Sequence, residues 1–163
     1  MLGRTANGLY WMFRYIERAE NIARLVDAGL RVSLTRAGSS DEDWHGVLES
    51  AGVRDAYKQV HAKLTAADAV DYLLRDTANS SSVLSCIESG RNNARMVRTA
   101  LTRETWEATN EAWLDLKARL ARNLKATELP ELIDVIKHRC ALIRGAFHGS
   151  MLRNDLYNFS RIG

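Results

Sequence analysis

The sequence predicts an all-α fold, a helical bundle of about five to seven helices with a long first helix. Three observations support this prediction. Apolar residues recur at three- and four-residue spacing over long segments, as they do on the buried face of a helix. The chain has a single proline, so few positions interrupt a helix. Its 163 residues, 46% of them hydrophobic, suffice for one domain with its own core.

The first helix is expected over residues 5–36, and its apolar residues keep the helical spacing from one end to the other. They are Leu9, Met12, Phe13, Ile16, Ala19, Ala23, Val26, Leu30 and Leu34. Gly38, Ser39 and Ser40 should end this helix, because glycine and serine favour turns over helix interiors.

Three shorter helices are expected next, separated by glycine and polar residues: one after Ser40, one over residues 54–63 and one over residues 65–74. Thr65 and Asp68 have the spacing of a capping box, which marks the start of the third helix. A polar stretch over residues 79–82 then breaks the chain again.

The second half of the chain predicts three further helices and a final segment: residues 83–101, 102–124, 130–149 and 151–163. Thr102 should cap the second of them, in which Trp106, Trp113 and Leu120 repeat every seven residues and are expected to be core. Pro130 suits the first turn of the helix that follows.

Composition excludes several classes of protein. The net charge is +3, and the Lys and Arg residues are spread along the predicted helices, with none of the concentrated basic stripes of nucleic-acid-binding proteins. No apolar run is long enough to cross a membrane, and no signal peptide is visible. Cys86 and Cys140 lie inside apolar helical patterns, which indicates reduced core thiols and a cytoplasmic location. We expect no nucleic-acid or membrane partner.

Charged residues fall on the apolar face of the first helix. A helical wheel places Glu20 and Asp27 near the centre of that face, with Glu17, Arg24 and Arg31 at one edge. We expect all five to be partly buried. The spacings of three and four residues allow Glu20–Arg24, Arg24–Asp27 and Asp27–Arg31 pairs, which would leave Glu17 in need of a partner.

The helix predicted over residues 83–101 offers that partner. Arg91 and Arg98 flank its apolar face, and Arg95 lies further round. Because buried charges are costly unless they are paired, we expect this arginine edge to pack against the acids of the first helix. The resulting network has two interpretations: a structural device that fixes helix register, or a site that binds a polar or anionic ligand or the charged end of a partner.

Other kinds of site receive little support from the sequence. A ferritin-like metal site needs two ExxH motifs, and Glu42–His45 is the only one present. His61, His138 and His148 have no neighbouring residues that would declare a catalytic triad. We therefore predict no catalytic residues, no metal and no cofactor. Tyr10 and Trp11 near Arg14 are either packing groups or an aromatic and cationic contact surface.

Residues 9–27, LYWMFRYIERAENIARLVD, resemble the opening signature of the bacterial alpha-E domain proteins, a family named for a Glu-Arg motif. Here the motif is Glu17-Arg18. A second block over residues 79–110 is also similar, through Arg91, Asn93-Ala94-Arg95, Val97-Arg98 and Glu104-Thr105-Trp106-Glu107. One position departs from the family pattern, because Asn92 stands where the family usually has an acid.

The resemblance implies a protein of about twice this length with two such motifs. Residues 154–157 and Arg161 echo residues 7–10 and Arg14, which agrees with an internal repeat, although the family register shifts this alignment by three residues. We therefore expect residues 1–163 to form a single alpha-E-like domain that stops before a second Glu-Arg motif.

Alpha-E proteins are typically encoded beside, or fused to, circularly permuted ATP-grasp proteins, and ATP-grasp enzymes join carboxylates to amines. The resemblance therefore implies a non-catalytic partner or substrate-positioning subunit of a peptide or amide ligase, since the chain lacks a phosphate-binding Gly-rich loop. Its partner would be the ligase or the peptide substrate. Two alternatives stay open: an enzyme that uses the Glu/Asp/Arg cluster for acid–base or metal-assisted chemistry, and a structural domain that forms a homo-oligomer.

Overall fold

The computed structural model describes residues 2–35, 40–122 and 124–163, and within these residues it contains helices and no strand. The α-helices are α1 (Leu2–Thr35), α2 (Ser40–Ser50), α3 (Arg54–Val60), α4 (Ala66–Leu74), α5 (Val83–Met96), α6 (Arg103–Leu120), α7 (Leu129–Ser150) and α8 (Asp155–Ile162). Two short 3-10 turns, η1 (Arg98–Ala100) and η2 (Ala126–Glu128), precede α6 and α7. The predicted all-α fold with a long first helix is confirmed.

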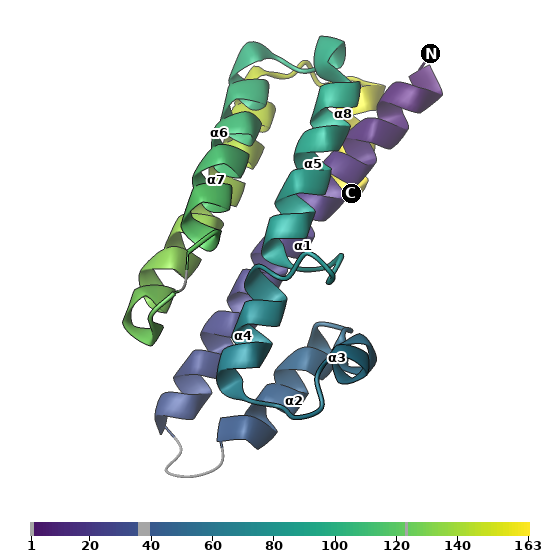
Figure 1. Ribbon diagram of the computed structural model, residues 1–163. Coiled ribbons are helices and arrows are strands. Elements are labelled where there is room, and N and C mark those ends of the chain that lie inside the picture. The colour runs from purple at the N-terminus through teal and green to yellow at the C-terminus, as the bar shows by residue number, and fades with distance from the viewer. Residues whose placement is uncertain (1, 36–39, 123) are drawn as a thin grey trace.

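Helix α1 is the spine of the bundle (Figure 1). Helices α5, α7 and α8 pack along it, α6 lies against α5 and α7, and α2 and α4 contact it near its C-terminal end. Its apolar residues are buried as predicted except Leu34, which is 87% exposed, and Leu30, which is half-buried. The exposure of Leu34 follows from its place in the last turn of α1, beyond the residues that the other helices cover.

The close approach of α1 and α5 depends on Gly90. A Cβ atom at this position would lie 3.3 Å from Cγ1 of Ile16 and 3.4 Å from the carbonyl oxygen of Met12. A glycine lets two helix backbones come together in this way, and the contact buries Ile87 and Ala94 on either side of it. This contact fixes how α5 is rotated against α1, which matters for the arginines on its edge.

The predicted helix starts agree with the structure. The hydroxyl oxygens of Thr65 and Thr102 accept hydrogen bonds from the backbone N–H groups of Asp68 and Thr105, at 3.1 and 3.3 Å. The glycine expected to separate the second and third helices is Gly52, and its φ of 70° ends the helical conformation there. The predicted helix stop at Gly38 and Ser39 lies outside the described residues.

Helix α5 is shorter than expected. It ends at Met96 instead of continuing to Leu101, and the chain passes through η1 before α6 begins. Val97 leaves the helical conformation, with φ −110° and ψ 25°, and its buried side chain packs beside Gly8 of α1. Periodicity alone did not reveal this end because Val97 and Leu101 are both buried, as helical spacing requires.

The two cysteines lie in the core, with fully buried side chains. Burial raises the pKa of the Cys86 thiol to about 11 and that of Cys140 to about 12. None of the described helices is both long and apolar enough to span a bilayer.

Candidate functional site

Glu20 is the central residue of the charged network, and its side chain is almost completely buried. One carboxylate oxygen, Oε1, accepts hydrogen bonds from Nη2 and Nε of Arg24, at 2.6 and 3.2 Å. The other, Oε2, accepts from Nη1 of Arg144, which comes from α7. Burial acts to raise the pKa of Glu20, but the hydrogen bonds and charges of Arg144 and Arg24 outweigh it and lower the pKa overall. Glu20 is therefore an ionised, doubly paired carboxylate.

Asp27 repeats this arrangement two turns further along α1, in a more open position. Its carboxylate pairs with Arg31 on the same helix, at 3.0 Å, and lies 3.6 Å from Nζ of Lys137 on α7. Lys137 in turn binds Asp134 at 2.7 Å. The predicted Glu20–Arg24 and Asp27–Arg31 pairs are thus both present, and each acid also faces a cation from α7.

The prediction that all five charged residues on the apolar face of α1 are partly buried is wrong for three of them. Side chains of Glu17, Arg24 and Arg31 are 50%, 62% and 74% exposed. The edge of the α1 apolar face on which they lie is not covered by another helix, so only Glu20 and Asp27, at the centre of that face, are partly or fully buried. Arg24 and Arg31 reach back to their acids from the surface.

The predicted pairing of Glu17 with Arg91 or Arg98 is also wrong. Glu17 binds Arg14 on its own helix, at 3.0 Å. Nε of Arg91 donates to Oδ1 of Asn110 on α6, at 2.8 Å. Because the buried face of α5 includes Ile87, Gly90 and Ala94, the arginine edge is turned toward α6 instead of α1.

Aromatic rings on α6 take the place of the expected carboxylates. The Arg91 guanidinium lies over the ring of Trp113, with 4.2 Å between its Cζ atom and the ring centroid, and Arg98 lies 5.5 Å from Trp106. Such cation–π contacts suit arginines that are not fully removed from solvent. Arg95, the third residue of the predicted edge, is exposed.

Arg18 connects α1 to the segment before α5. Its Nη1 donates to Oγ of Ser81 at 3.1 Å, a contact between residues far apart in the sequence. Ser81 is buried, and its backbone N–H donates to Oδ1 of Asn79, so the hydrogen bond reaches an ordered turn. Arg18 therefore helps to hold the fold, while its neighbour Glu17 projects outward.

Three side chains on the outer face of α1, Arg14, Glu17 and Asn21, form a ridge between two hollows. The first hollow, of about 460 Å³, lies toward α7 and α8 and also contains Glu20, Arg144 and Arg161. The second, of about 300 Å³, lies toward the end of α2 and also contains Arg18 and Ser81. The ridge is polar and accessible from both sides, which makes it the candidate functional site.

Other chemistry-bearing groups do not gather here. Among the residues that the structure describes, no three His, Cys, Asp or Glu side chains come together as a possible metal site. His148 lies in the first hollow, and its Nδ1 is 2.9 Å from the hydroxyl of Tyr157. This hydrogen bond joins α7 to α8.

A comparison with family models decides which family the chain represents. The model named Alpha-E, described as a predicted alpha-helical domain with a conserved ER motif, matches residues 1–163. The chain belongs to the Alpha-E family. Glu17 and Arg18 are the only adjacent Glu-Arg pair in the sequence, so the ER motif of this Alpha-E chain places Glu17 on the ridge of α1 and Arg18 in the second hollow beside it. No curated protein and no solved structure matches the chain.

The sequence analysis did not predict two arginines of the first hollow, Arg144 and Arg161. Arg144 has a recognisable signal, because it lies between Cys140 and Phe147 on the apolar side of α7 and is a charge that needs a partner. Arg161 has none, since its position in the hollow depends on how α8 packs against α1.

Proposed function

We propose that this Alpha-E chain is a non-catalytic helical module that binds and positions either an ATP-grasp-type peptide or amide ligase or the peptide substrate of that ligase. The observation that carries the proposal is the exposure of Glu17. It belongs to the motif for which the family is named, yet half of its side chain is in solvent and its ion pair is a local surface pair. Such pairs contribute little to stability, so folding does not explain the presence of this acid.

The two residues of the ER motif have different roles in this proposal. Arg18 supports the fold through Ser81, and Glu17 is available to a partner, which can approach the ridge from either hollow. A hydrogen-bond donor on the partner, such as a backbone N–H or a cationic side chain, would bind the Glu17 carboxylate. The link to an ATP-grasp ligase rests on the ATP-grasp proteins that are typically encoded beside, or fused to, members of the family.

An enzyme that uses the buried acid has less support. A general acid or base needs a pKa near the working pH, whereas Arg144 and Arg24 lower the pKa of Glu20. Both carboxylate oxygens of Glu20 are engaged by guanidinium groups, which leaves little room for a substrate proton. The geometry favours a structural role for Glu20 and a binding role for Glu17.

Co-purification tests the proposal directly. The protein is expressed together with an ATP-grasp-type ligase, and capture of one is expected to retain the other. The Glu17→Gln variant should fold normally and lose at least about tenfold in affinity, the size expected for a charge-assisted contact. Glu107→Gln is the matched control, because Glu107 is 48% exposed and pairs with Arg103 on its own helix.

Three results would count against the proposal: no association between the folded proteins, equal association of the Glu17→Gln and Glu107→Gln variants, or turnover of a substrate by the Alpha-E protein alone. Circular dichroism of each variant confirms that the helices are intact before affinities are compared.

A further inference from the structure

Lys and Arg residues occur along the whole chain, but the excess of positive over negative charge falls at one end of the bundle. This basic end consists of the first half of α1 and the segment that contains α8, residues 2–18 and 151–163, which pack together (Figure 1). It contains five arginines and two acidic residues, so it carries a charge of +3, equal to the net charge of the entire chain. All other charged residues cancel. The basic end carries these residues: Arg4, Arg14, Arg18, Arg153, Arg161, Glu17 and Asp155.

Several of these arginines are not neutralised by neighbours. Within the described part of the chain, Arg4 and Arg161 are exposed and form neither an ion pair nor a hydrogen bond. Arg18 donates to the neutral hydroxyl of Ser81. Among the residues that the structure describes, Arg14 is the one arginine of the basic end with an acidic partner, Glu17, in an exposed pair. The basic end therefore presents a positive field to solvent.

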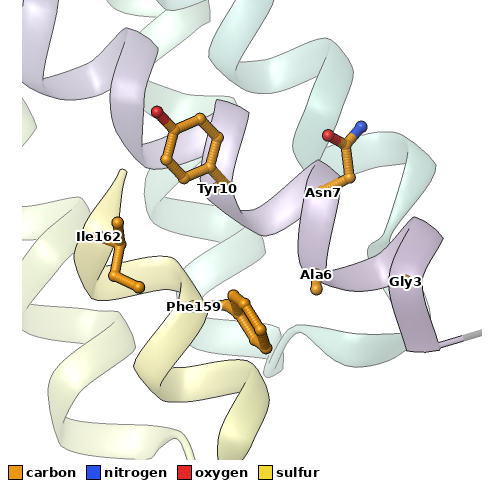
Figure 2. Close-up of a pocket in the computed structure, with 6 residues that line it drawn as sticks. All are labelled: Gly3, Ala6, Asn7, Tyr10, Phe159 and Ile162. Atoms are coloured by element: carbon orange, nitrogen blue, oxygen red, sulfur yellow. The ribbon is translucent and has the colours of Figure 1, made fainter.

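An apolar groove of about 550 Å³ lies within this basic end, between α1 and α8 (Figure 2). Figure 2 shows Phe159 and Ile162 from α8 beside Ala6 and Tyr10 from α1. Gly3 and Ala6 have small side chains, which leaves the groove open, and a Cβ at Gly3 would have no neighbour within 4 Å. The groove is lined by Gly3, Ala6, Asn7, Tyr10, Phe159 and Ile162.

Large apolar side chains remain in solvent around the groove. Phe159 is 48% exposed, Ile162 is 70% exposed, and Trp11, which packs edge-on against Tyr10, is 41% exposed. Trp, Tyr and Arg are the residues most enriched among the energetically dominant positions of protein interfaces. Exposed apolar groups grouped in this way mark a surface that another molecule covers.

We propose that this groove binds an acidic amphipathic segment of a partner protein, with apolar side chains in the groove and carboxylates against Arg4, Arg14 and Arg161. The inference deepens the proposed function and rests on it, because it names the kind of segment that the module receives. Charge complementarity selects the acidic partner. A second copy of the chain would bring an identical charge of +3 against the same face, which disfavours self-association there.

The shape of the groove favours a peptide over a lipid surface. Its volume matches a recess for one or two large side chains, set between two helices that stand on either side of it. A flat bilayer surface would contact the rims and leave the recess empty. The unpaired arginines close to it would add long-range attraction that weakens with salt.

A pair of designed peptides tests the proposal on the full-length protein. Both are helical, about 15 residues long and capped at each end, with Leu and Phe on one face; one carries Glu on its flanks and the other carries Lys at the same positions. The Glu peptide should bind with a dissociation constant of about 10–100 μM and shift the NMR signal of the Trp11 indole N–H. Raising NaCl to about 500 mM should weaken binding at least about fivefold.

Two variants locate the site, each with a matched control. Arg161→Glu should weaken the Glu peptide about tenfold, whereas Lys58→Glu, an exposed reversal on α3, should leave the affinity unchanged. Ala6→Leu should block the groove and weaken binding to a similar extent, whereas Ala28→Leu, an exposed change on the same helix, should not.

The proposal is overturned if the Lys peptide binds as well as the Glu peptide, if Arg161→Glu and Ala6→Leu leave binding intact, or if vesicles of phosphatidylglycerol bind while the Glu peptide does not. Its failure is separable from that of the proposed function. Retention of the ligase without peptide binding rejects this inference alone, and peptide binding without any association with the ligase rejects the proposed function alone.

Discussion

The two sides of α1 use charged residues in opposite ways. On the sealed side, represented by Ile16, Glu20 and Ala23, the helix is covered by α5 and α7, and Glu20 is held by guanidinium groups from two helices. On the open side, represented by Arg14, Glu17 and Asn21, the residues face solvent and Glu17 has a local partner. Glu17 and Glu20 are three residues apart, yet one is committed to the fold and the other is free to act outside it.

This difference shows that an acidic residue on an apolar helix face does not by itself indicate a functional site. The free-energy cost of burying a carboxylate is offset only where cations from a neighbouring helix reach it, as Arg144 does. Where no helix covers the face, the same residue type costs nothing to keep in water and can be used for binding. Four measurements test whether the two sides of α1 differ in this way.

The largest effect is expected for Glu20→Ala. The substitution leaves Arg144 and Arg24 close together without their shared acid, so we expect the free energy of unfolding to fall by about 2–3 kcal/mol. Urea denaturation followed by circular dichroism measures this loss. Equal losses for Glu20→Ala and Glu17→Ala would mean that the two sides do not differ.

Acidic pH should reproduce part of this effect. The pKa of Glu20 is lowered in the folded state, so its ionisation stabilises the fold above the ordinary value of 4.5, and this contribution is lost as pH falls through the lower folded pKa. Burial also acts to raise the pKa of Asp115, but Arg119 and Arg139 lower it overall, which adds to the acid sensitivity. The stability advantage of the parent over Glu20→Gln should therefore shrink below about pH 4.5. An advantage that grows on acidification would contradict this assignment.

Substitution of two helical glycines by alanine compares a tightly packed position with an exposed one. Gly90→Ala places a Cβ against Ile16 and a backbone oxygen of α1, so we expect a loss of about 1–2 kcal/mol in the free energy of unfolding. Gly145→Ala in α7 meets nothing within 4 Å, and alanine's better helix propensity should stabilise the fold by about 0.5–1 kcal/mol. Thermal unfolding of both variants provides the measurement. A stabilising Gly90→Ala would show that α1 and α5 are less tightly packed.

The smallest effect is expected for Glu17→Gln. Both side chains of its ion pair with Arg14 are exposed, so the free energy of unfolding should change by less than about 0.5 kcal/mol. Chemical denaturation alongside Glu107→Gln, the matched surface pair on α6, checks this expectation. A loss above about 1 kcal/mol would place Glu17 in the folding network and remove the basis of the proposed binding role.

Much of the fold follows from local signals in the sequence. The capping residues Thr65 and Thr102 set two helix starts, and the i, i+4 pairs Glu20–Arg24 and Asp27–Arg31 follow directly from the rise and turn of a helix. These features involve residues within one turn of each other. They depend on the geometry of a single helix, which periodicity describes well.

The partners between helices were decided by tertiary packing. Arg144 was not predicted to reach Glu20, and Arg91 was predicted to reach Glu17 but instead contacts Asn110 and Trp113. A wheel shows which residues share a face, but it does not show which neighbour covers that face or how far the cover extends. The rotation of α5 depends on the Gly90 contact, a long-range fit that no local pattern encodes.

The helices, most of their starts and the presence of charge on the apolar face of α1 can therefore be predicted without the structure, because these features follow from spacing and residue chemistry along one chain segment. Tertiary packing decides that the Glu20 side chain is almost completely buried while half of the Glu17 side chain is exposed, and that α8 completes a basic, apolar groove with the start of α1. Burial is a property of neighbouring helices, because a side chain is removed from water only by what packs over it.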